Sequence, residues 1–492
     1  MPTEVKNILK ALEDASYKAY LVGGCVRDFL LGKAPKDWDI ATSATPPEIQ
    51  KIFPESVYEN QFGTVAVKTE STEPNLKIIE VTTFRLEGKY SDKRHPDEVK
   101  FAKTIEEDLS RRDFTINALA MDGGDKIIDP FGGQKDLKNK IIRTVGEPEK
   151  RFEEDALRLM RAVRFSAQLD FEINEETQKA VKDKAGLIEF IAKERIRDEF
   201  EKLLMTDKAV RGIADLQKLG LLKYLIPELE EGIGVEQNKH HIYTVFEHNL
   251  KSLEYAVKKG FSLELRLASL LHDVGKPRSR AWKNDLRGEK TFRGKKGDWT
   301  FYQHQYVGEK LSLDILDRLR FSKKIIEEVA LLVREHMFVY DPEMVTEKGV
   351  RRLIRRVGPD NIDNLLMLRE ADRIGSGVPK AQPYRLRHLK AMIEKVKKDP
   401  VSVKMLKING SDVMELGELE PGPRVGHILS VLLDEVLTNP ELNDKKTLSK
   451  RIKELNELSD AELKKLSDKA KQTAQDVQKR IDENIKKKYF VK

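Results

Sequence analysis

Two neighbouring stretches near the start of the chain decide how it can fold: LVGGCVRD (residues 21–28) and KDWDI (residues 36–40). The first is an apolar run that breaks at Gly23 and Gly24 and restarts as a predicted helix. Glycines between a strand and a helix let the backbone approach an anion, and the N–H groups at the helix start point at it. This stretch therefore predicts a phosphate-binding turn.

The second stretch carries Asp37 and Asp39 in a strand-like segment. Residues at this spacing project from the same face of a strand, so the two carboxylates converge while Trp38 points away. Carboxylates beside substrate phosphates suit Mg²⁺. A glycine turn followed by two solvated aspartates has the same residues, so this stretch alone leaves the two interpretations about equal.

Composition limits the remaining possibilities. A chain of 492 residues predicts three or four domains at roughly 150 residues each. The first 20 residues carry no apolar signal-peptide segment, and no apolar run is long enough to span a bilayer. We therefore expect a soluble, cytoplasmic protein with no membrane partner. The single cysteine, Cys25, excludes an intramolecular disulfide, and the net charge of +7 permits a polyanionic partner.

The hydrophobic pattern divides the chain into a mixed part and a helical part. Residues 1–145 alternate between predicted helices at 5–15 and 46–53 and predicted strands at 19–22, 64–67 and 76–81. Residues 85–100 are charged and aperiodic, which is typical of a mobile loop. From residue 149 onward the period is helical, with helices expected at 153–168, 175–184, 193–205 and 208–219. Residues 280–300 suggest an exposed insertion, and residues 444–487 a terminal helix or hairpin.

Two further motifs lie before the helical part. RRDFTINA (residues 111–118) is expected to start a helix, where an arginine such as Arg112 could bind a phosphate or ribose and Asp113 or Asn117 a hydroxyl. The alternative is a surface ion pair worth well under ~1 kcal/mol. DPFGGQKDL (residues 129–137) is rich in turn residues and is interpreted as a hinge to the helical part.

The helical stretch EDALRLMRAVRF (residues 154–165) is more specific. On one continuous helix, Asp155, Arg158 and Arg161 would form a stripe about 120° wide. A carboxylate that accepts beside an arginine that donates can match the edge of a nucleobase. Taken alone, an exposed helix with ion pairs of about 0.2–0.5 kcal/mol each is the simpler interpretation.

Together, in their order along the chain, these motifs resemble class II tRNA nucleotidyltransferases, the CCA-adding family among the polymerase-β-like nucleotidyltransferases. The resemblance implies that Asp37 and Asp39 are catalytic and hold two Mg²⁺ ions. It implies a set of nucleotide-binding residues that contact the triphosphate (Gly24, Arg27), the ribose (Arg112, Asp113), the base (Asp155, Arg158) and the rest of the pocket (Arg161, Arg164). The expected partners are the tRNA 3′ end, CTP and ATP.

A second constellation lies in residues 241–372. It consists of His248, His272, Asp273, His304, His336 and Asp372. For any one of these histidines alone a packed or surface role is the usual one, but as a set they resemble the HD phosphohydrolase superfamily. That resemblance implies a second divalent metal site, for Mn²⁺, Ni²⁺, Co²⁺ or Fe²⁺. It also suggests hydrolysis of a phosphoester on damaged tRNA ends.

The expected fold class is therefore α+β. A polymerase-β-like nucleotidyltransferase head with a mixed sheet (residues 1–145) precedes an all-α neck (146–230), an HD body (231–380) and a helical, tRNA-binding tail (381–492). Basic residues that could follow the acceptor arm of tRNA are Arg351, Arg352, Arg355, Arg356, Arg385, Arg387 and Lys390.

Several alternatives remain at this point. The nearest is an A-adding relative. CC-adding enzymes of this family tend to lack the loop at residues 85–100, so its presence here disfavours CC addition but does not separate CCA addition from A addition. A poly(A) polymerase typically lacks the HD set. From another class, an HD hydrolase could use the head as a regulatory nucleotide-binding domain, and a binding-only RNA chaperone would need neither site. Glu80 lies on a neighbouring predicted strand, but its match to a third metal-binding carboxylate is too poor to include it.

Overall fold

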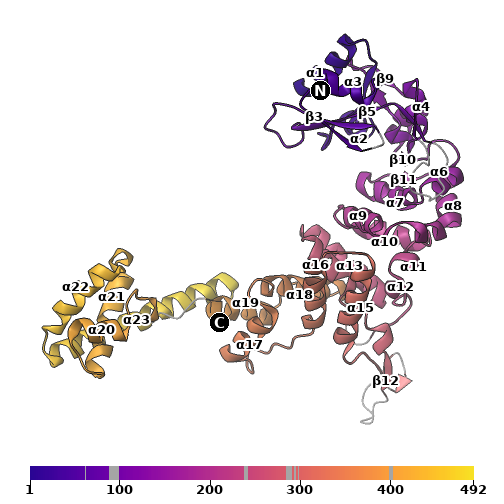
Figure 1. Ribbon diagram of the computed structural model, residues 1–492. Helices are drawn as coiled ribbons and strands as arrows, with labels where there is room; N and C mark the ends of the chain where they lie inside the picture. The colour runs from indigo at the N-terminus through magenta and orange to yellow at the C-terminus, as the bar shows by residue number, and fades with distance from the viewer. Residues whose placement is uncertain are drawn as a thin grey trace. The chain divides into compact units, whose positions relative to one another are not determined.

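The structure is a computed structural model that describes residues 1–60, 63–87, 99–237, 242–283, 291–292, 295–296, 298–397 and 403–491 (Figure 1). The chain divides into two compact units. The first comprises residues 1–336 and 367–379, and the second comprises residues 337–366 and 380–492. The finer division into four domains stays a prediction.

The head of the first unit is built on a seven-stranded mixed sheet with the order β3-β4-β5-β2-β1-β8-β9. Its strands are β1 (Ala19–Val22), β2 (Asp39–Thr42), β3 (Ser56–Asn60), β4 (Thr64–Lys68), β5 (Ile78–Thr83), β8 (Ala120–Met121) and β9 (Ile127–Ile128). β2 and β5 pair in parallel, whereas β2 and β1 are antiparallel. β2 therefore lies inside the sheet. Its first residue, Asp39, lies at the end of the strand that is next to the glycine turn.

Short helices surround this sheet: α1 (Thr3–Asp14), α2 (Gly24–Leu30), α3 (Pro46–Ile52), α4 (Ile105–Ser110), α5 (Gly133–Asn139) and the 3₁₀ turn η1 (Thr115–Asn117). α1 buries Val5, Ile8, Leu9 and Leu12, which recur at the helical period. α3 begins at a capping box in which Thr45 and Glu48 satisfy each other's backbone N–H groups. The predicted mixed α/β head is confirmed.

One prediction for the head is wrong, and a second is wrong at the ends of the predicted segment. Residues 111–118 do not start a helix: Arg111 caps the end of α4, and only η1 follows. The expected loop at 85–100 begins and ends as an antiparallel ribbon of β6 (Arg85–Glu87) and β7 (Val99–Phe101). Residues 88–98 lie outside the described residues.

The neck contains α6 (Pro148–Glu154), α7 (Leu157–Leu169), α8 (Glu175–Lys184), η2 (Ala185–Phe190), α9 (Lys193–Leu204), α10 (Ala209–Lys218), α11 (Leu222–Leu225) and α12 (Pro227–Glu230). The short strands β10 (Ile141–Ile142) and β11 (Glu172–Ile173) pair in parallel beside them. The prediction of one helix over 153–168 is wrong, because Asp155 has extended backbone angles (φ −139°, ψ 103°) that separate α6 from α7.

The rest of the first unit is helical: α13 (Val245–Lys258), α14 (Leu263–Leu271), the 3₁₀ turn η3 (Pro277–Ser279), α15 (His304–Arg318), α16 (Lys323–Glu335) and the end of α18 (Ile362–Gly375). The predicted insertion contains short strands, β12 (Ala281–Lys283) paired with β15 (Asp298–Thr300) and β13 (Thr291–Phe292) paired with β14 (Lys295–Lys296). Residues 284–290, 293–294 and 297 of this insertion lie outside the described residues.

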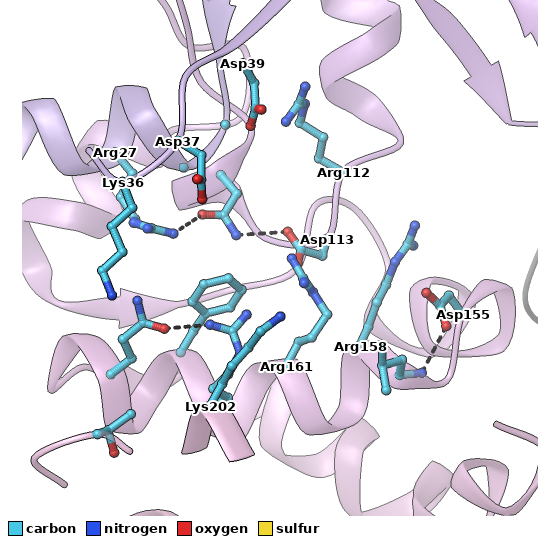
Figure 2. A pocket seen from close by; sticks show the side chains of 18 of the residues that line it. Arg27, Lys36, Asp37, Asp39, Arg112, Asp113, Asp155, Arg158, Arg161 and Lys202 are labelled. Atoms are coloured by element: carbon cyan, nitrogen blue, oxygen red, sulfur yellow. Dashed lines mark hydrogen bonds and ion pairs between the residues drawn. The ribbon is translucent and has the colours of Figure 1, made fainter. Parts of the chain in front are cut away.

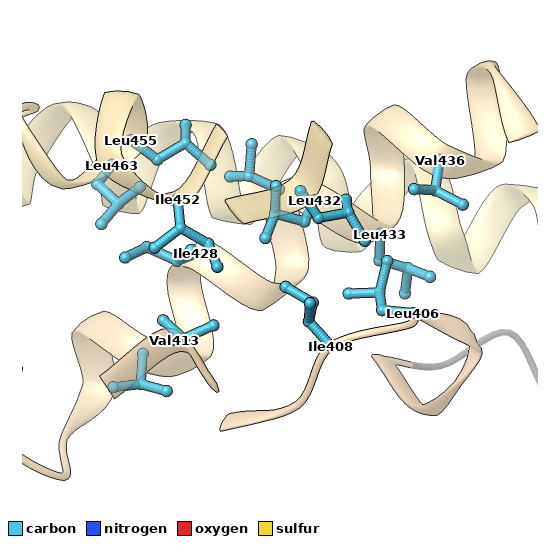
Figure 3. Close-up of a cluster of buried hydrophobic side chains, with 13 residues drawn as sticks. Leu406, Ile408, Val413, Ile428, Leu432, Leu433, Val436, Ile452, Leu455 and Leu463 are labelled. Atoms are coloured by element: carbon cyan, nitrogen blue, oxygen red, sulfur yellow. The ribbon is translucent and has the colours of Figure 1, made fainter. Parts of the chain in front are cut away.

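The second unit is helical: α17 (Glu347–Val357), α19 (Tyr384–Lys397), η4 (Val403–Met405), α20 (Gly410–Gly417), α21 (Pro423–Thr438), η5 (Pro440–Leu442), α22 (Lys445–Asn456) and α23 (Asp460–Tyr489). Its core gathers side chains from α20–α23, among them Ile428, Leu432, Ile452 and Leu463, which are all buried (Figure 3). The predicted helix or hairpin at residues 444–487 consists of two helices, α22 and α23, and α23 packs mainly against α21 and α19. Within the described residues, no helix combines the length and apolarity needed to cross a membrane.

Candidate active sites

The glycine turn between β1 and α2 depends on Gly23 rather than on Gly24. Gly23 has φ +79°, and a Cβ added there would lie 2.6 Å from a guanidinium nitrogen of Arg112. A Cβ on Gly24 would meet only Arg27, at an ordinary 3.7 Å. Gly23 therefore supplies both the left-handed backbone and the space that lets Arg112 approach the turn.

Asp37 and Asp39 line one cavity of about 850 Å³ together with the glycine turn. Asp39 is the first residue of β2, and Asp37 lies just before the strand. Trp38 between them is buried, with 7% of its surface exposed, as the alternation predicts. In Figure 2 both carboxylates lie with Arg112 at one side of the pocket, opposite Arg161 and Lys202. The structure thus brings the two aspartates to one wall of the cavity.

The electrostatics around Asp39 fit a divalent cation. Burial and the negative charge of Asp37 raise the pKa of Asp39, and Arg112 opposes this rise. A divalent cation between the two carboxylates would favour their ionised forms, and the carboxylates would supply the oxygen ligands that Mg²⁺ prefers. Glu80 on β5 is paired with Asp39 in the parallel register, so a third carboxylate stands on the adjacent strand.

A chain of hydrogen bonds connects the glycine turn to the neck. Arg27 donates to Oδ1 of Asn117 at 2.7 Å, and the Asn117 amide donates to Oδ1 of Asp113 at 3.0 Å. Arg161 on α7 donates to Oδ2 of Asp113 at 2.7 Å. Asp113 is buried, with 7% of its surface exposed. These contacts fix the orientation of two arginines that face the cavity.

We expect the Asp113→Asn variant to be less stable than the wild type by about 2 kcal/mol at pH 7. Burial alone would raise the pKa of Asp113, but the charge of Arg161 and the hydrogen bond from Asn117 lower it to about 2. Because the folded-state pKa is below the unfolded value, this stability is present above about pH 4 and is lost as the pH falls towards 2.

Urea unfolding of both proteins between pH 7 and pH 2 measures this difference. The exposed Asp14, changed to Asn, is the control, and it should leave the unfolding midpoint unchanged across the range. A difference between Asp113→Asn and the wild type that persists at pH 2 would contradict the assigned cause.

Three arginines of the cavity lie close to the ring of Phe165 on α7. The guanidinium carbons of Arg164, Arg161 and Arg27 lie 3.8, 5.1 and 5.3 Å from the ring centroid. Glu199 on α9, with 3% of its surface exposed, pairs with Arg164 and lies 3.7 Å from Arg161. Cation–π contacts and a buried carboxylate therefore hold several positive charges in one cavity.

The base-reading pair predicted from the sequence is arranged differently from the expected stripe. Asp155 is bound by Arg195 of α9, whose guanidinium nitrogens lie 3.3 and 2.8 Å from its two carboxylate oxygens. Arg158 is buried and donates to Glu154 and to the carbonyl oxygens of Arg151 and Arg111. Both Asp155 and Arg158 still line the cavity. The expected pairs within one helix are wrong, but the two side chains do reach the same cavity as Asp37 and Asp39.

The second constellation is also brought together, deep in the helical part of the first unit. Its residues form two groups, and the candidate ligand atoms within each group lie within 4.8 Å of one another. One group is His248, His272 and Asp372, and the other is Asp273, His304 and His336. The six side chains come from α13, α15, α18 and the residues that follow α14 and α16. All six residues are at most 8% exposed.

Asp273 stands between the two groups. Its Oδ2 lies 3.1 Å from Nε2 of His248, and its Oδ1 lies 3.3 Å from Nε2 of His304. Burial alone would lower the pKa of His248, but hydrogen bonds with Asp273 and Asp372 raise it to about 9. The Lys276 ammonium, 2.6 Å from Asp273, lowers the pKa of that carboxyl well below its usual range. Imidazoles and carboxylates are ligands for divalent metals, and these residues could hold such ions, with Asp273 near both groups.

Comparison with known proteins places the chain in a family. The chain is 37% identical over 462 residues to a CCA-adding enzyme of Ligilactobacillus salivarius (strain UCC118), covering 92% of this chain and 98% of that protein. The chain belongs to the CCA-adding enzyme family. A second member of the family, from Geobacillus sp. (strain WCH70), is 49% identical over 219 residues, which are 44% of this chain and 53% of that protein.

Structures and family descriptions agree with this assignment. The crystal structure of the Bacillus stearothermophilus CCA-adding enzyme in complex with CTP is 30% identical, with a TM-score of 0.56 over 93% of this chain and 98% of that one. The Poly A polymerase head domain matches residues 19–143, and the probable RNA and SrmB-binding site of polymerase A matches residues 170–233. The HD domain matches residues 245–376. The chain is thus a tRNA nucleotidyltransferase of the CCA-adding family with an HD domain.

Some contacts that hold the sites of this CCA-adding family member could not be predicted from the sequence. Asn117 is separated by 90 residues from Arg27, and Arg195 by 40 residues from Asp155, so no local pattern indicates either contact. Glu199 has a signal: a carboxylate on the apolar face of α9, beside Phe200, needs a buried partner. Lys276 follows Asp273 by three residues, a helical spacing that would suggest the pair.

Proposed function

We propose that this chain adds CCA to the 3′ end of tRNA, taking CTP and ATP as substrates without a nucleic-acid template. One observation carries the proposal: Asp37 and Asp39 line the same cavity as Asp155 and Arg158. A polymerase whose protein replaces the template needs two things in one cavity. It needs a carboxylate pair for phosphoryl transfer, and it needs a hydrogen-bond donor and acceptor that recognise the base. The cytoplasm, where tRNA is matured in bacteria, is the proposed location.

Nucleotide binding is assigned to the arginines and the glycine turn. Arg27 and Arg112 stand at the turn and would bind the triphosphate, while Arg161 and Arg164 complete the positive wall of the cavity. Arg112 and Asp113 would lie near the ribose and help to select ribonucleotides. Two Mg²⁺ ions held by Asp37 and Asp39 would activate the 3′-hydroxyl of the tRNA and neutralise the leaving pyrophosphate.

Base selection is assigned to Asp155 and Arg158. Cytosine and adenine both carry an exocyclic amino group, whereas uracil and guanine carry a carbonyl oxygen at that position. Asp155, which accepts only, fits the amino group, and Arg158, which donates only, fits a ring nitrogen. The pair can therefore select C and A against U and G.

A direct experiment separates this function from its relatives. Three transcripts of one tRNA are used, ending before CCA, after CC, and after CCA, each with labelled CTP or ATP. CCA addition predicts CMP and AMP incorporation into the first, AMP alone into the second, and little into the third. An A-adding enzyme would extend only the second transcript, and a CC-adding enzyme would stop the first at CC.

The second unit offers a surface for the body of tRNA. α17 and α19 pack side by side, and the arginine pairs 351–352 and 355–356 of α17 are exposed. α19 adds Arg385, Arg387 and Lys390. Positive side chains from two packed helices form a surface that can follow a phosphate backbone.

We expect tRNA binding to weaken steeply with salt, and the log–log slope should decrease by about 1 for each phosphate that a variant no longer binds. Replacing Arg352 and Arg355 by Gln should therefore lower the slope by about 2, as measured by filter binding at a series of KCl concentrations. Lys323, exposed on α16, provides the control when changed to Gln. An unchanged slope in the double variant would show that these arginines are an ordinary solvated helix face.

A second function is proposed for the HD domain, because both ligand groups are complete and buried. We propose metal-dependent hydrolysis of 2′,3′-cyclic phosphate or phosphate groups on damaged tRNA ends. Mn²⁺, Ni²⁺, Co²⁺ or Fe²⁺ held by these residues would activate a water for attack on the phosphoester. His248 must lose its proton when a metal binds, so metal uptake should release protons at neutral pH.

A further inference from the structure

The base-reading carboxylate of Asp155 is held by a residue from another helix. We infer that Arg195 is a positioning residue that fixes which acceptor of Asp155 faces the incoming base, and so sharpens the choice of nucleotide. This inference rests on the proposed function. Arg195 lies in the first turn of α9, and its side chain and that of Asp155 are 28% and 16% exposed. Both residues line the nucleotide cavity.

Asp155 needs such a partner because of its place in the backbone. It is extended between α6 and α7, so neither helix fixes its side chain. Oδ1 accepts from the Leu157 N–H at 3.1 Å and from Arg195 at 3.3 Å. Oδ2 accepts from the other Arg195 nitrogen at 2.8 Å. A guanidinium bound through two nitrogens sets the plane of the carboxylate as well as its position.

The hydrogen bonds of Asp155 leave few acceptor positions of its carboxylate for the nucleotide. Each carboxylate oxygen has two acceptor positions. The two contacts to Oδ1 occupy both of its positions, whereas Oδ2 keeps one position after its contact with Arg195. The fixed carboxylate therefore offers one strong acceptor in one direction. This suits the amino group of cytosine or adenine and repels the carbonyl oxygen of uracil or guanine.

The contact of Arg195 with Asp155 has a second consequence. The two-point contact holds the carboxylate in one orientation. Without Arg195, Asp155 could rotate and turn its free acceptor away from the amino group of the correct base, which would weaken the preference for CTP and ATP. Arg195 thus acts on selection through Asp155, which lies at a different side of the pocket from Asp37 and Asp39 (Figure 2).

The test compares Arg195→Gln, Arg195→Lys and the control Arg197→Gln. Arg197 lies two residues further along α9 and binds Asp198 and the carbonyl oxygen of Arg320 instead. kcat/KM is measured for CTP and UTP on a tRNA that ends before CCA, and for ATP and GTP on one that ends after CC. We expect Arg195→Gln to reduce both preferences at least tenfold, Arg195→Lys to restore part of them, and Arg197→Gln to match the wild type.

A double-mutant cycle shows whether Arg195 acts through Asp155. In an Asp155→Asn background, Arg195→Gln should change the CTP-over-UTP preference less than twofold. Full additivity of the two changes, or an Arg195→Lys variant with wild-type preference, would overturn the inference. A wild-type protein that adds neither CMP nor AMP overturns the proposed function and the inference with it, and this is seen before any variant is measured.

Arg195→Lys keeps the positive charge but supplies a single point of contact, so it tests the two-point geometry even where Gln weakens the neck. The melting temperature of each variant, compared with that of Arg197→Gln, separates loss of fold from loss of selection. A melting temperature shared by all variants together with a loss of preference only at residue 195 supports the inference.

Discussion

Replacing Asp37 by Ala should abolish the addition of both CMP and AMP to tRNA. Asp37 and Asp39 form the carboxylate wall of the nucleotide cavity, and the proposed Mg²⁺ ions depend on both. Metal stabilisation of a phosphoryl-transfer transition state is worth several kcal/mol, which corresponds to a loss of about 1,000-fold or more. Single-turnover extension of a labelled tRNA ending before CCA measures the loss.

The control for this prediction is Asp14→Ala, an exposed aspartate at the end of α1. It should extend tRNA at the wild-type rate. Because the side chain of Asp37 is exposed rather than packed in the core, the Asp37→Ala variant should keep its fold and any phosphohydrolase activity of the HD domain. An Asp37→Ala protein that still extends tRNA would show that the metal assignment is wrong.

The parts of the site that lie close together in sequence could be predicted from sequence. The glycine turn, the alternation of Asp37, Trp38 and Asp39, and the order of strands and helices around them are local patterns. The sheet register adds a feature that these patterns do not contain: β2 and β5 pair in parallel with Glu80 opposite Asp39. That pairing depends on how separate strands assemble, which no local pattern determines.

In the neck, the sequence indicates residues that do line the cavity, but it does not indicate how they are arranged. Helical spacing places Asp155, Arg158 and Arg161 on one stripe, and the structure instead breaks the helix at Asp155. The break lets Asp155 pair with Arg195, and it leaves Arg161 to bind Asp113. Tertiary partners from α9 and from the connection after α4 therefore override the local helical pattern.

In the HD domain, the candidate metal ligands follow no local sequence pattern. Its six candidate ligands are spread along the chain from His248 to Asp372, and periodicity alone gives no reason to bring them together. Only the resemblance of the whole set to the HD phosphohydrolase superfamily predicts that they come together. The structure adds that the two carboxylate oxygens of Asp273 face different groups, since one lies near His248 and the other near His304.

This position of Asp273 leads to the second large effect that we expect. Asp273→Ala should remove a ligand from both groups and abolish metal-dependent hydrolysis of a 2′,3′-cyclic phosphate at a tRNA end. Loss of two adjacent metal sites predicts a loss of about 1,000-fold or more. CCA addition by the same variant should remain at the wild-type rate, because Asp273 lies outside the nucleotide cavity.

Variants of one group at a time sharpen the test. His272→Ala removes a ligand from the group with His248 and Asp372, and His336→Ala removes one from the group with His304. Each is assayed with Mn²⁺, Ni²⁺, Co²⁺ and Fe²⁺, and metal content is measured by mass spectrometry. If both groups hold metal, each single variant should lose about one of two bound ions, whereas Asp273→Ala should lose both. A wild-type protein that is inert on cyclic phosphate with all four metals would mean that the HD domain keeps its ligands without this activity.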